Sequence, residues 1–129
     1  MTFKNPQHKR FFFEMLETTK KNDSYGRAFF YIAGLSEDTR KHIGDIFDFE
    51  ENCIEPDGLS KGWQTSGSRK ITLMAFNLWN GYVEPDCEEE CTPNELFSTP
   101  DAMCFMEEIK QRFPEFVREP EQKGKEFMR

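Results

Sequence analysis

The cysteine and histidine residues are the side chains of this sequence whose spacing is best suited to chemistry. Cys87 and Cys91 are separated by three glutamates, and thiol pairs with two to four intervening residues are typical of structural zinc sites. Cys53 lies in another polar segment, and His42 or Cys104 can supply a fourth ligand. One hypothesis is therefore a structural zinc site formed by Cys53, Cys87, Cys91 and His42.

The alternative is that the thiols are reduced and have no ligand role. The three glutamates between the paired cysteines raise the pKa of nearby thiols unless a cation is bound there, and Cys104 adjoins an apolar helical face. A catalytic pair of Cys53 with His42 or His8 would need a third, orienting group, which the sequence does not indicate. We expect the protein not to be an enzyme.

Two segments are rich in acidic residues and contain no lysine or arginine. The first acidic segment, residues 45–57, contains Asp45, Asp48, Glu50, Glu51, Glu55 and Asp57. The second acidic segment, residues 84–95, contains Glu84, Asp86, Glu88, Glu89, Glu90 and Glu95. Basic residues are concentrated at the two ends of the chain and at Arg69 and Lys70, so the formal net charge of −7 is unevenly distributed. This distribution predicts a negative surface whose field extends about 8–10 Å at physiological salt.

The negative surface limits the classes of partner. Direct binding to nucleic acid is disfavoured, because it requires a positive footprint for the phosphates. A protein partner with a basic surface is favoured instead, and all the acids named above from Asp45 to Glu90 are candidate partner-binding residues. The alternative is that the acids only keep a chain with 14 phenylalanines soluble.

A polar loop with sequence GWQTSGSRK, residues 62–70, adds two further candidates. Trp63 is a candidate interface anchor, since exposed tryptophans often contribute strongly to binding. The glycines, serines and adjacent basic residues resemble a cradle for an anion at a helix N-terminus, although the P-loop spacing is absent. The alternative is a polar cap on a buried helix.

The elements that position these residues are predicted to be helices. Residues 6–20 follow an Asn5-Pro6 start signal, and a second helix runs from Asp23 or Ser24 to Gly34. A third helix begins after Ser36, and an irregular connection with a short turn at residues 56–59 follows over residues 48–62.

The central helix is predicted over residues 68–81, because its apolar residues point to every side, with Ser68 as its cap and Gly81 as its end. Thr92 and Glu95 form a capping box for a short helical turn. Thr99-Pro100 is the predicted start of the last helix. Its expected apolar face is formed by Ala102, Phe105, Met106, Ile109 and Phe113.

Length and composition predict one domain. The chain has 129 residues, of which 36% are hydrophobic, and no segment approaches the 18 apolar residues of a membrane span. No signal-like apolar stretch follows Lys4, Lys9 and Arg10, so we expect a cytoplasmic protein with reduced thiols. The predicted fold is all-α: a compact domain of about five short helices with irregular acidic loops over residues 1–117, followed by a flexible charged tail over residues 118–129.

Several stretches together resemble an uncharacterised family of small proteins encoded by conjugative elements and phages of Gram-positive anaerobic bacteria. The most specific is GWQTSGSRKITLMAFNLWNG, residues 62–81. The others are RAFFYIAGLSEDTRKHIGDIFDF (27–49), CIEP (53–56), TPNELF (92–97) and IKQRFPEF (109–116). The resemblance implies a protein carried by a mobile element in a bacterial cytoplasm and assigns no catalytic residue.

Charge pattern and resemblance together suggest a function. Small acidic proteins of mobile elements often block host nucleases with basic DNA channels, as anti-CRISPR and anti-restriction proteins do. We therefore expect a non-enzymatic inhibitor whose negative face mimics DNA and competes with nucleic acid for a defence nuclease. The alternative is a regulatory or scaffold module that binds a protein through Trp63 and the polar loop, with or without a structural Zn²⁺ site.

Overall fold

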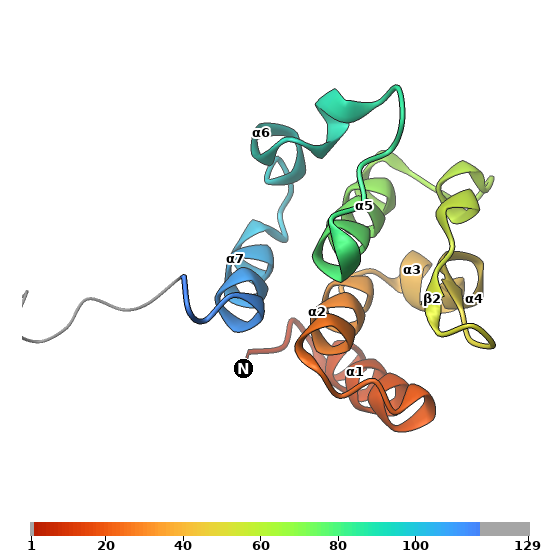
Figure 1. Ribbon diagram of the computed structural model, residues 1–129, viewed down its shortest axis with the longest axis vertical. Coiled ribbons are helices and arrows are strands. Elements are labelled where there is room, and N and C mark those ends of the chain that lie inside the picture. The colour runs from red at the N-terminus through yellow and green to blue at the C-terminus, as the bar shows by residue number, and fades with distance from the viewer. Residues whose placement is uncertain (1, 117–129) are drawn as a thin grey trace, which may run out of the picture.

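The computed structural model describes residues 2–116, which form a mainly helical fold (Figure 1). The α-helices are α1 (Pro6–Thr19), α2 (Ser24–Ala33), α3 (Glu37–Lys41), α4 (Ile43–Ile46), α5 (Ser66–Asn80), α6 (Pro93–Leu96) and α7 (Ala102–Arg112). Two 3₁₀ turns, η1 (Pro56–Ser60) and η2 (Glu88–Cys91), lie in the long connections. The tail predicted over residues 118–129 lies outside the described residues.

The first two helices begin and end as their sequence signals predict. The Asn5 side chain accepts a hydrogen bond from the backbone N–H of His8, and Pro6 occupies the first helical position of α1. The Asp23 side chain caps α2 by accepting from the backbone N–H of Gly26. Each such cap satisfies a backbone donor that has no partner within the helix.

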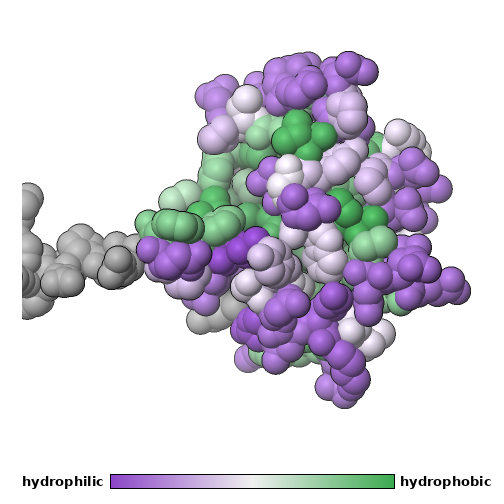
Figure 2. Space-filling model, viewed as in Figure 1, coloured by the Kyte–Doolittle hydropathy of each residue, from purple (hydrophilic) through white to green (hydrophobic). Residues whose placement is uncertain are grey.

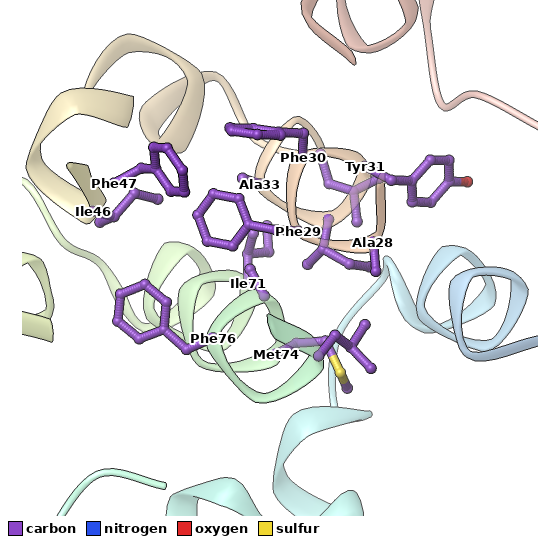
Figure 3. Packing of buried hydrophobic residues seen from close by; sticks show 14 of the residues in the cluster. Ala28, Phe29, Phe30, Tyr31, Ala33, Ile46, Phe47, Ile71, Met74 and Phe76 are labelled. Atoms are coloured by element: carbon purple, nitrogen blue, oxygen red, sulfur yellow. The ribbon is translucent and has the colours of Figure 1, made fainter. Parts of the chain in front are cut away.

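Helix α2 lies at the centre of the packing, between α1, α5 and α7 (Figure 1). Every residue from Ala28 to Ala33 is buried, so this helix is enclosed on all sides over its second half. Figure 3 shows Phe29 of α2 directed between Phe47 and Phe76. The helix α5, predicted as the organising element, is buried on several faces as expected and shares this role with α2.

The predicted starts of the last two long helices need correction. The cap of α5 is Thr65, which accepts from the backbone N–H of Ser68, while the Ser68 hydroxyl accepts from the backbone N–H of Thr65 at 2.8 Å. Ser68 is therefore the third helical residue of a reciprocal capping box. The N-cap residue of α7 is Asp101 and not Thr99. The Asp101 carboxylate forms an ion pair with Lys4 at 2.8 Å. Gly81 ends α5 at φ 80°, as predicted.

The connection at residues 48–62 contains a small antiparallel strand pair that the sequence did not indicate. Strands β1 (Phe47–Asp48) and β2 (Cys53–Ile54) pair Phe47 with Ile54 and Asp48 with Cys53. The Asp48 carboxylate accepts from the backbone N–H groups of Glu50 and Glu51, and Asn52 adopts φ 54°. Two-residue strands are too short for an alternation of side chains to be visible in the sequence. The turn expected at residues 56–59 is present as η1.

His8 fixes the N-terminal segment on the helical core. The ring is fully buried, its Nδ1 accepts from the backbone N–H of Lys4 at 3.0 Å, and its Nε2 lies 2.7 Å from the Tyr31 carbonyl oxygen. A carbonyl can only accept, so Nε2 carries a hydrogen. Nδ1 accepts a hydrogen bond and therefore carries none, so the imidazole is neutral. Burial is the main cause that lowers the pKa of His8 from 6.5, although the bond to Tyr31 opposes it.

Replacement of His8 is expected to have a pH-dependent cost. Because the folded-state pKa lies below 6.5, the stabilisation by neutral His8 is complete above that pH and is lost as the pH falls through the folded-state pKa. We expect the free energy of unfolding lost in His8→Gln, measured by urea denaturation, to be larger at pH 7.5 than at pH 5. Comparing both proteins at the same pH cancels the titration of other groups. A difference that grows towards acid pH would contradict this prediction.

Candidate functional site

The first acidic segment is held by α4, the strand pair and η1. Gly58 of η1 lies against α4, where a Cβ atom at this position would approach the Asp45 carbonyl oxygen to 2.3 Å. Only glycine permits this close approach of the two backbones. The segment therefore has a fixed path. Its exposed acids are Glu50, Glu51 and Asp57, and its half-buried acids are Asp45, Asp48 and Glu55.

The second acidic segment occupies the loop between α5 and α6, which includes η2, and ends within α6. Asp86 adopts φ 64°, a left-handed conformation that aspartate tolerates better than most residues. Thr92 caps α6 by accepting from the backbone N–H of Glu95, as predicted. In this segment Asp86, Glu88, Glu89 and Glu95 are exposed, whereas Glu84 and Glu90 are half-buried.

Arg69 of α5 joins the second acidic segment to η1, the turn in which the first acidic segment ends. Its Nε and Nη2 donate to both carboxylate oxygens of Glu90 at 3.0 and 3.1 Å, and its Nη1 donates to the carbonyl oxygen of Leu59 in η1 at 3.0 Å. A bidentate contact of this kind fixes the carboxylate in the guanidinium plane. The hydrogen bond from Arg69 is the main cause that lowers the pKa of Glu90. Helix α5 thus holds η1 and η2 on neighbouring parts of its surface.

Tyr82 lies just before the second acidic segment, between α5 and Glu84. Its hydroxyl donates to Glu84 at 3.4 Å. Burial first, and then the Glu84 carboxylate, raise the pKa of Tyr82, and the Asp57 carboxylate of the first segment contributes in the same direction. Negative charge from both segments therefore acts on one phenol.

In the described part of the chain, few of these acids form an ion pair with a neighbouring cation. Among the ion pairs within residues 2–116, Arg69 with Glu90 is the one that joins an acid of the two segments to a lysine or arginine. Cations nearer the chain ends have other partners: Lys4 binds Asp101, and Arg112 donates to the Leu78 carbonyl oxygen. Within residues 2–116, the exposed acids of both segments are therefore not paired with a lysine or arginine.

The polar loop before α5 uses its polar groups within the fold. Thr65 and Ser68 cap α5, Arg69 is bound to Glu90 and Leu59, and Lys70 donates to the Ser98 carbonyl oxygen at 2.7 Å. Ser66, Arg69, Lys70 and Glu90 are among the residues that line a hollow of about 330 Å³. The two basic side chains of the expected anion cradle thus already have partners, which favours the interpretation as a helix cap.

Trp63 forms a cluster with two other predicted site residues. Its indole N–H donates to Asp45 Oδ2 at 2.9 Å. The His42 ring stacks on the indole with centroids 4.6 Å apart and an interplanar angle of 11°, and His42 Nδ1 lies 3.9 Å from Asp45 Oδ2. We refer to His42, Asp45 and Trp63 as the His–Asp–Trp cluster. It places an aromatic pair at the edge of the first acidic segment.

The predicted zinc ligands lie in separate parts of the fold. Cys53 is on β2, His42 is stacked on Trp63, and Cys87 and Cys91 flank the glutamates of η2, which is distant from β2 (Figure 1). No group of three or more possible metal ligands is present within residues 2–116. Burial followed by the Asp48 carboxylate raises the pKa of Cys53, and a hydrogen bond with Glu90 is the main cause that raises the pKa of Cys87.

One buried acid was not expected from the sequence. Glu108 of α7 is 1% exposed, whereas Met106, predicted on the apolar face of the same helix, is 45% exposed. The apolar face of α7 is therefore rotated relative to the prediction. Here the glutamate is buried and the methionine is exposed, which is the reverse of what their hydrophobicity favours. Hydrophobic periodicity therefore could not have predicted either position.

These features define a small, mainly helical protein whose two acidic segments are fixed around the N-terminal half of one helix. The chain belongs to the Family of unknown function (DUF6075), which matches residues 1–125. No curated protein and no solved structure matches the chain significantly. Within the described part of the chain, no helix has the length and apolar character that a membrane crossing requires.

Proposed function

We propose that this protein is a non-enzymatic inhibitor, encoded by a mobile genetic element, that binds a host defence nuclease of the CRISPR or restriction type. In this proposal its acidic surface occupies the nucleic-acid channel of the nuclease in the bacterial cytoplasm. The observation that carries it is the exposure of Glu50, Glu51, Asp57, Glu88 and Glu89 without an ion pair to a lysine or arginine within residues 2–116. The origin in a mobile element rests on the sequence resemblance.

The physical basis is charge complementarity with a surface that binds phosphates. A nucleic-acid channel gains most of its sequence-independent affinity from lysine and arginine side chains that neutralise phosphates. Carboxylates presented on a protein surface can bind the same cations, and complementary fields raise the association rate up to about 10⁸–10⁹ M⁻¹s⁻¹ at low salt.

The way in which the acids are held also supports binding. Glu50 and Glu51 lie in a turn fixed by Asp48, and Glu90 is fixed by Arg69. A surface whose backbone is fixed before binding loses less conformational entropy when a partner docks. The acids therefore sit on ordered turns, which suits a rigid inhibitor better than a segment that folds on binding.

A plasmid-challenge assay tests this function. The chain is co-expressed in bacteria with a panel of CRISPR and restriction nucleases, and transformation by a plasmid carrying the target site is counted. We expect the chain to restore transformation against at least one nuclease to a level clearly above that of the vector control. Transformation that stays at the level of the vector control across both classes would exclude the proposal for the nucleases tested.

The second candidate function is a regulatory or scaffold module that binds a protein through the His–Asp–Trp cluster. The stacking of His42 on Trp63 favours it, because a fixed aromatic pair loses little side-chain entropy on binding. This alternative predicts binding that depends weakly on salt and is lost in Trp63→Ala. The inhibitor proposal predicts strong salt dependence and a smaller effect of that substitution.

A structural zinc ion remains part of the second candidate function. Of the proposed ligands, Cys87 and Cys91 lie in the same short segment and are the pair on which such a site would be built. Metal analysis of untagged protein purified without added zinc should give near one equivalent if the site is structural. A value near zero would exclude it.

A further inference from the structure

Helix α7 packs against α2 (Figure 1), and Glu108 of α7 is a buried carboxyl group. Glu108 is 1% exposed, and its Oε2 is a buried polar atom without a hydrogen-bond partner. A buried carboxylate without partners is strongly disfavoured, so such a group remains in the fold as the neutral acid. Phe105, one turn earlier on the same face, is also fully buried.

Within residues 2–116, the charged groups around Glu108 do not fully compensate a negative charge. Arg27 of α2 is the cation that acts on it, but its guanidinium donates to the Asn22 side chain at 2.8 Å and lies over the Phe12 ring. Glu107 adds a second carboxylate beside it. Within residues 2–116, no ion pair joins Glu108 to a lysine or arginine.

The remaining titratable groups near this interface have other partners. On α2, the Tyr31 hydroxyl donates to the Thr2 carbonyl oxygen. On α7, the Arg112 guanidinium lies over the Tyr25 ring at 3.9 Å, and Cys104 is hydrogen-bonded with Tyr31. Helix α5 also packs against α7, but its titratable side chains Arg69 and Lys70 are bound to Glu90 and Ser98, as described above.

We propose that α7 is a pH-sensitive helix that docks stably on α2 only while the Glu108 carboxyl group is uncharged. Burial raises the pKa of Glu108 from 4.5 to about 8, which agrees with this arrangement. When α7 undocks, Glu108 enters water, and its pKa returns to the ordinary range. Because the undocked state then binds the proton less tightly, the fraction of undocked α7 increases as the pH rises from about 5 to about 8.

Undocking would change the surface of the protein. The outer side of α7 already exposes Met103 and Met106, which are 82% and 45% exposed, and Figure 2 shows apolar residues over this part of the molecule. Release of the helix would add Phe105 to this apolar surface. The docking of α7 therefore controls how much hydrophobic surface the protein presents, independently of the acidic segments.

Hydrogen exchange of the full chain tests the proposal. Protection factors, which correct for the intrinsic pH dependence of exchange, are measured for α7 and for α1 between pH 5.5 and 7.5. We expect protection in α7 to fall about 100-fold over these two pH units, at about tenfold per unit, and to fall much less in α1. In Glu108→Gln, which keeps the shape but cannot ionise, protection in α7 should be independent of pH.

Glu107→Gln, on the neighbouring residue of the same helix, is the matched control and should keep the pH dependence. Equal slopes in wild type and Glu108→Gln, equal slopes in α7 and α1, or no slope in wild type would each overturn the proposal. Should Glu108→Gln not fold, the carboxyl ¹³C shift of Glu108 in the wild-type protein decides the question. A titration midpoint near 8 supports the switch, and a midpoint near 4.5 contradicts it.

Discussion

Substitution of Phe29 by alanine is expected to remove about 3–5 kcal/mol of folding free energy, the usual cost of truncating a fully buried phenylalanine. The Phe29 ring is 0% exposed and contacts Phe30, Phe47 and Trp79 with centroids 5.0–5.8 Å apart, while Phe76 stacks at 6.4 Å. These rings come from α2, β1 and α5. The cavity would therefore loosen the junction that holds the first acidic segment on the rest of the core.

Urea denaturation followed by circular dichroism measures this effect. Domains of this size are typically stable by about 5–15 kcal/mol, so the loss is a large fraction of the total. Phe116→Ala is the matched control, because Phe116 is 80% exposed and its truncation should change stability by about 0.5 kcal/mol or less. A loss below about 1 kcal/mol in Phe29→Ala would show that α2 is not the centre of the packing.

Reversal of four exposed acids is expected to abolish inhibition. The variant carries Glu50→Lys, Glu51→Lys, Glu88→Lys and Glu89→Lys, with two substitutions in each acidic segment. Each substitution changes the charge by two, so the formal net charge changes from −7 to +1. Loss of electrostatic steering should lower the association rate with the nuclease by about a hundredfold or more. The number of transformants in the plasmid-challenge assay should then fall to that of the vector control.

The matched control reverses the same number of exposed glutamates elsewhere. Its substitutions are Glu14→Lys, Glu17→Lys, Glu37→Lys and Glu115→Lys, which give the same net charge. If the position of the acids in the two acidic segments matters, this control still inhibits the nuclease and restores most of the transformation. Equal loss in both variants would show that net charge alone acts, and full protection by the first variant would remove the charge mechanism.

Most of the helical architecture could be predicted from local signals. The Asn5-Pro6 start, the Asp23 cap, the Thr92 cap and the left-handed Gly81 act within one turn of their own positions, so the sequence contains all the information they require. The cap of α5 was misassigned because Thr65 and Ser68 are both capping residues, and the polar loop gives no apolar boundary between them.

The tertiary details could not be predicted because they depend on residues that are distant in sequence. The position of Glu108 at the interface of α7 with α2 is one example, and the closure of the N-terminal segment on His8 is another. The four proposed zinc ligands are a third example: spacing relates Cys87 to Cys91, but nothing local relates either thiol to Cys53 or His42. In contrast, the exposure of most acids followed from their number and from the absence of basic neighbours.

Mutual exclusion of this protein and nucleic acid on the nuclease tests the central claim most directly. A fluorescently labelled DNA duplex is bound to the purified nuclease identified by the plasmid-challenge assay, and its anisotropy is followed while this protein is added. We predict that the DNA is displaced, with a midpoint that shifts to higher protein concentration as DNA or salt is increased. A ternary complex would contradict the claim. In that case the protein binds the nuclease, but the anisotropy stays high because the DNA remains bound as well.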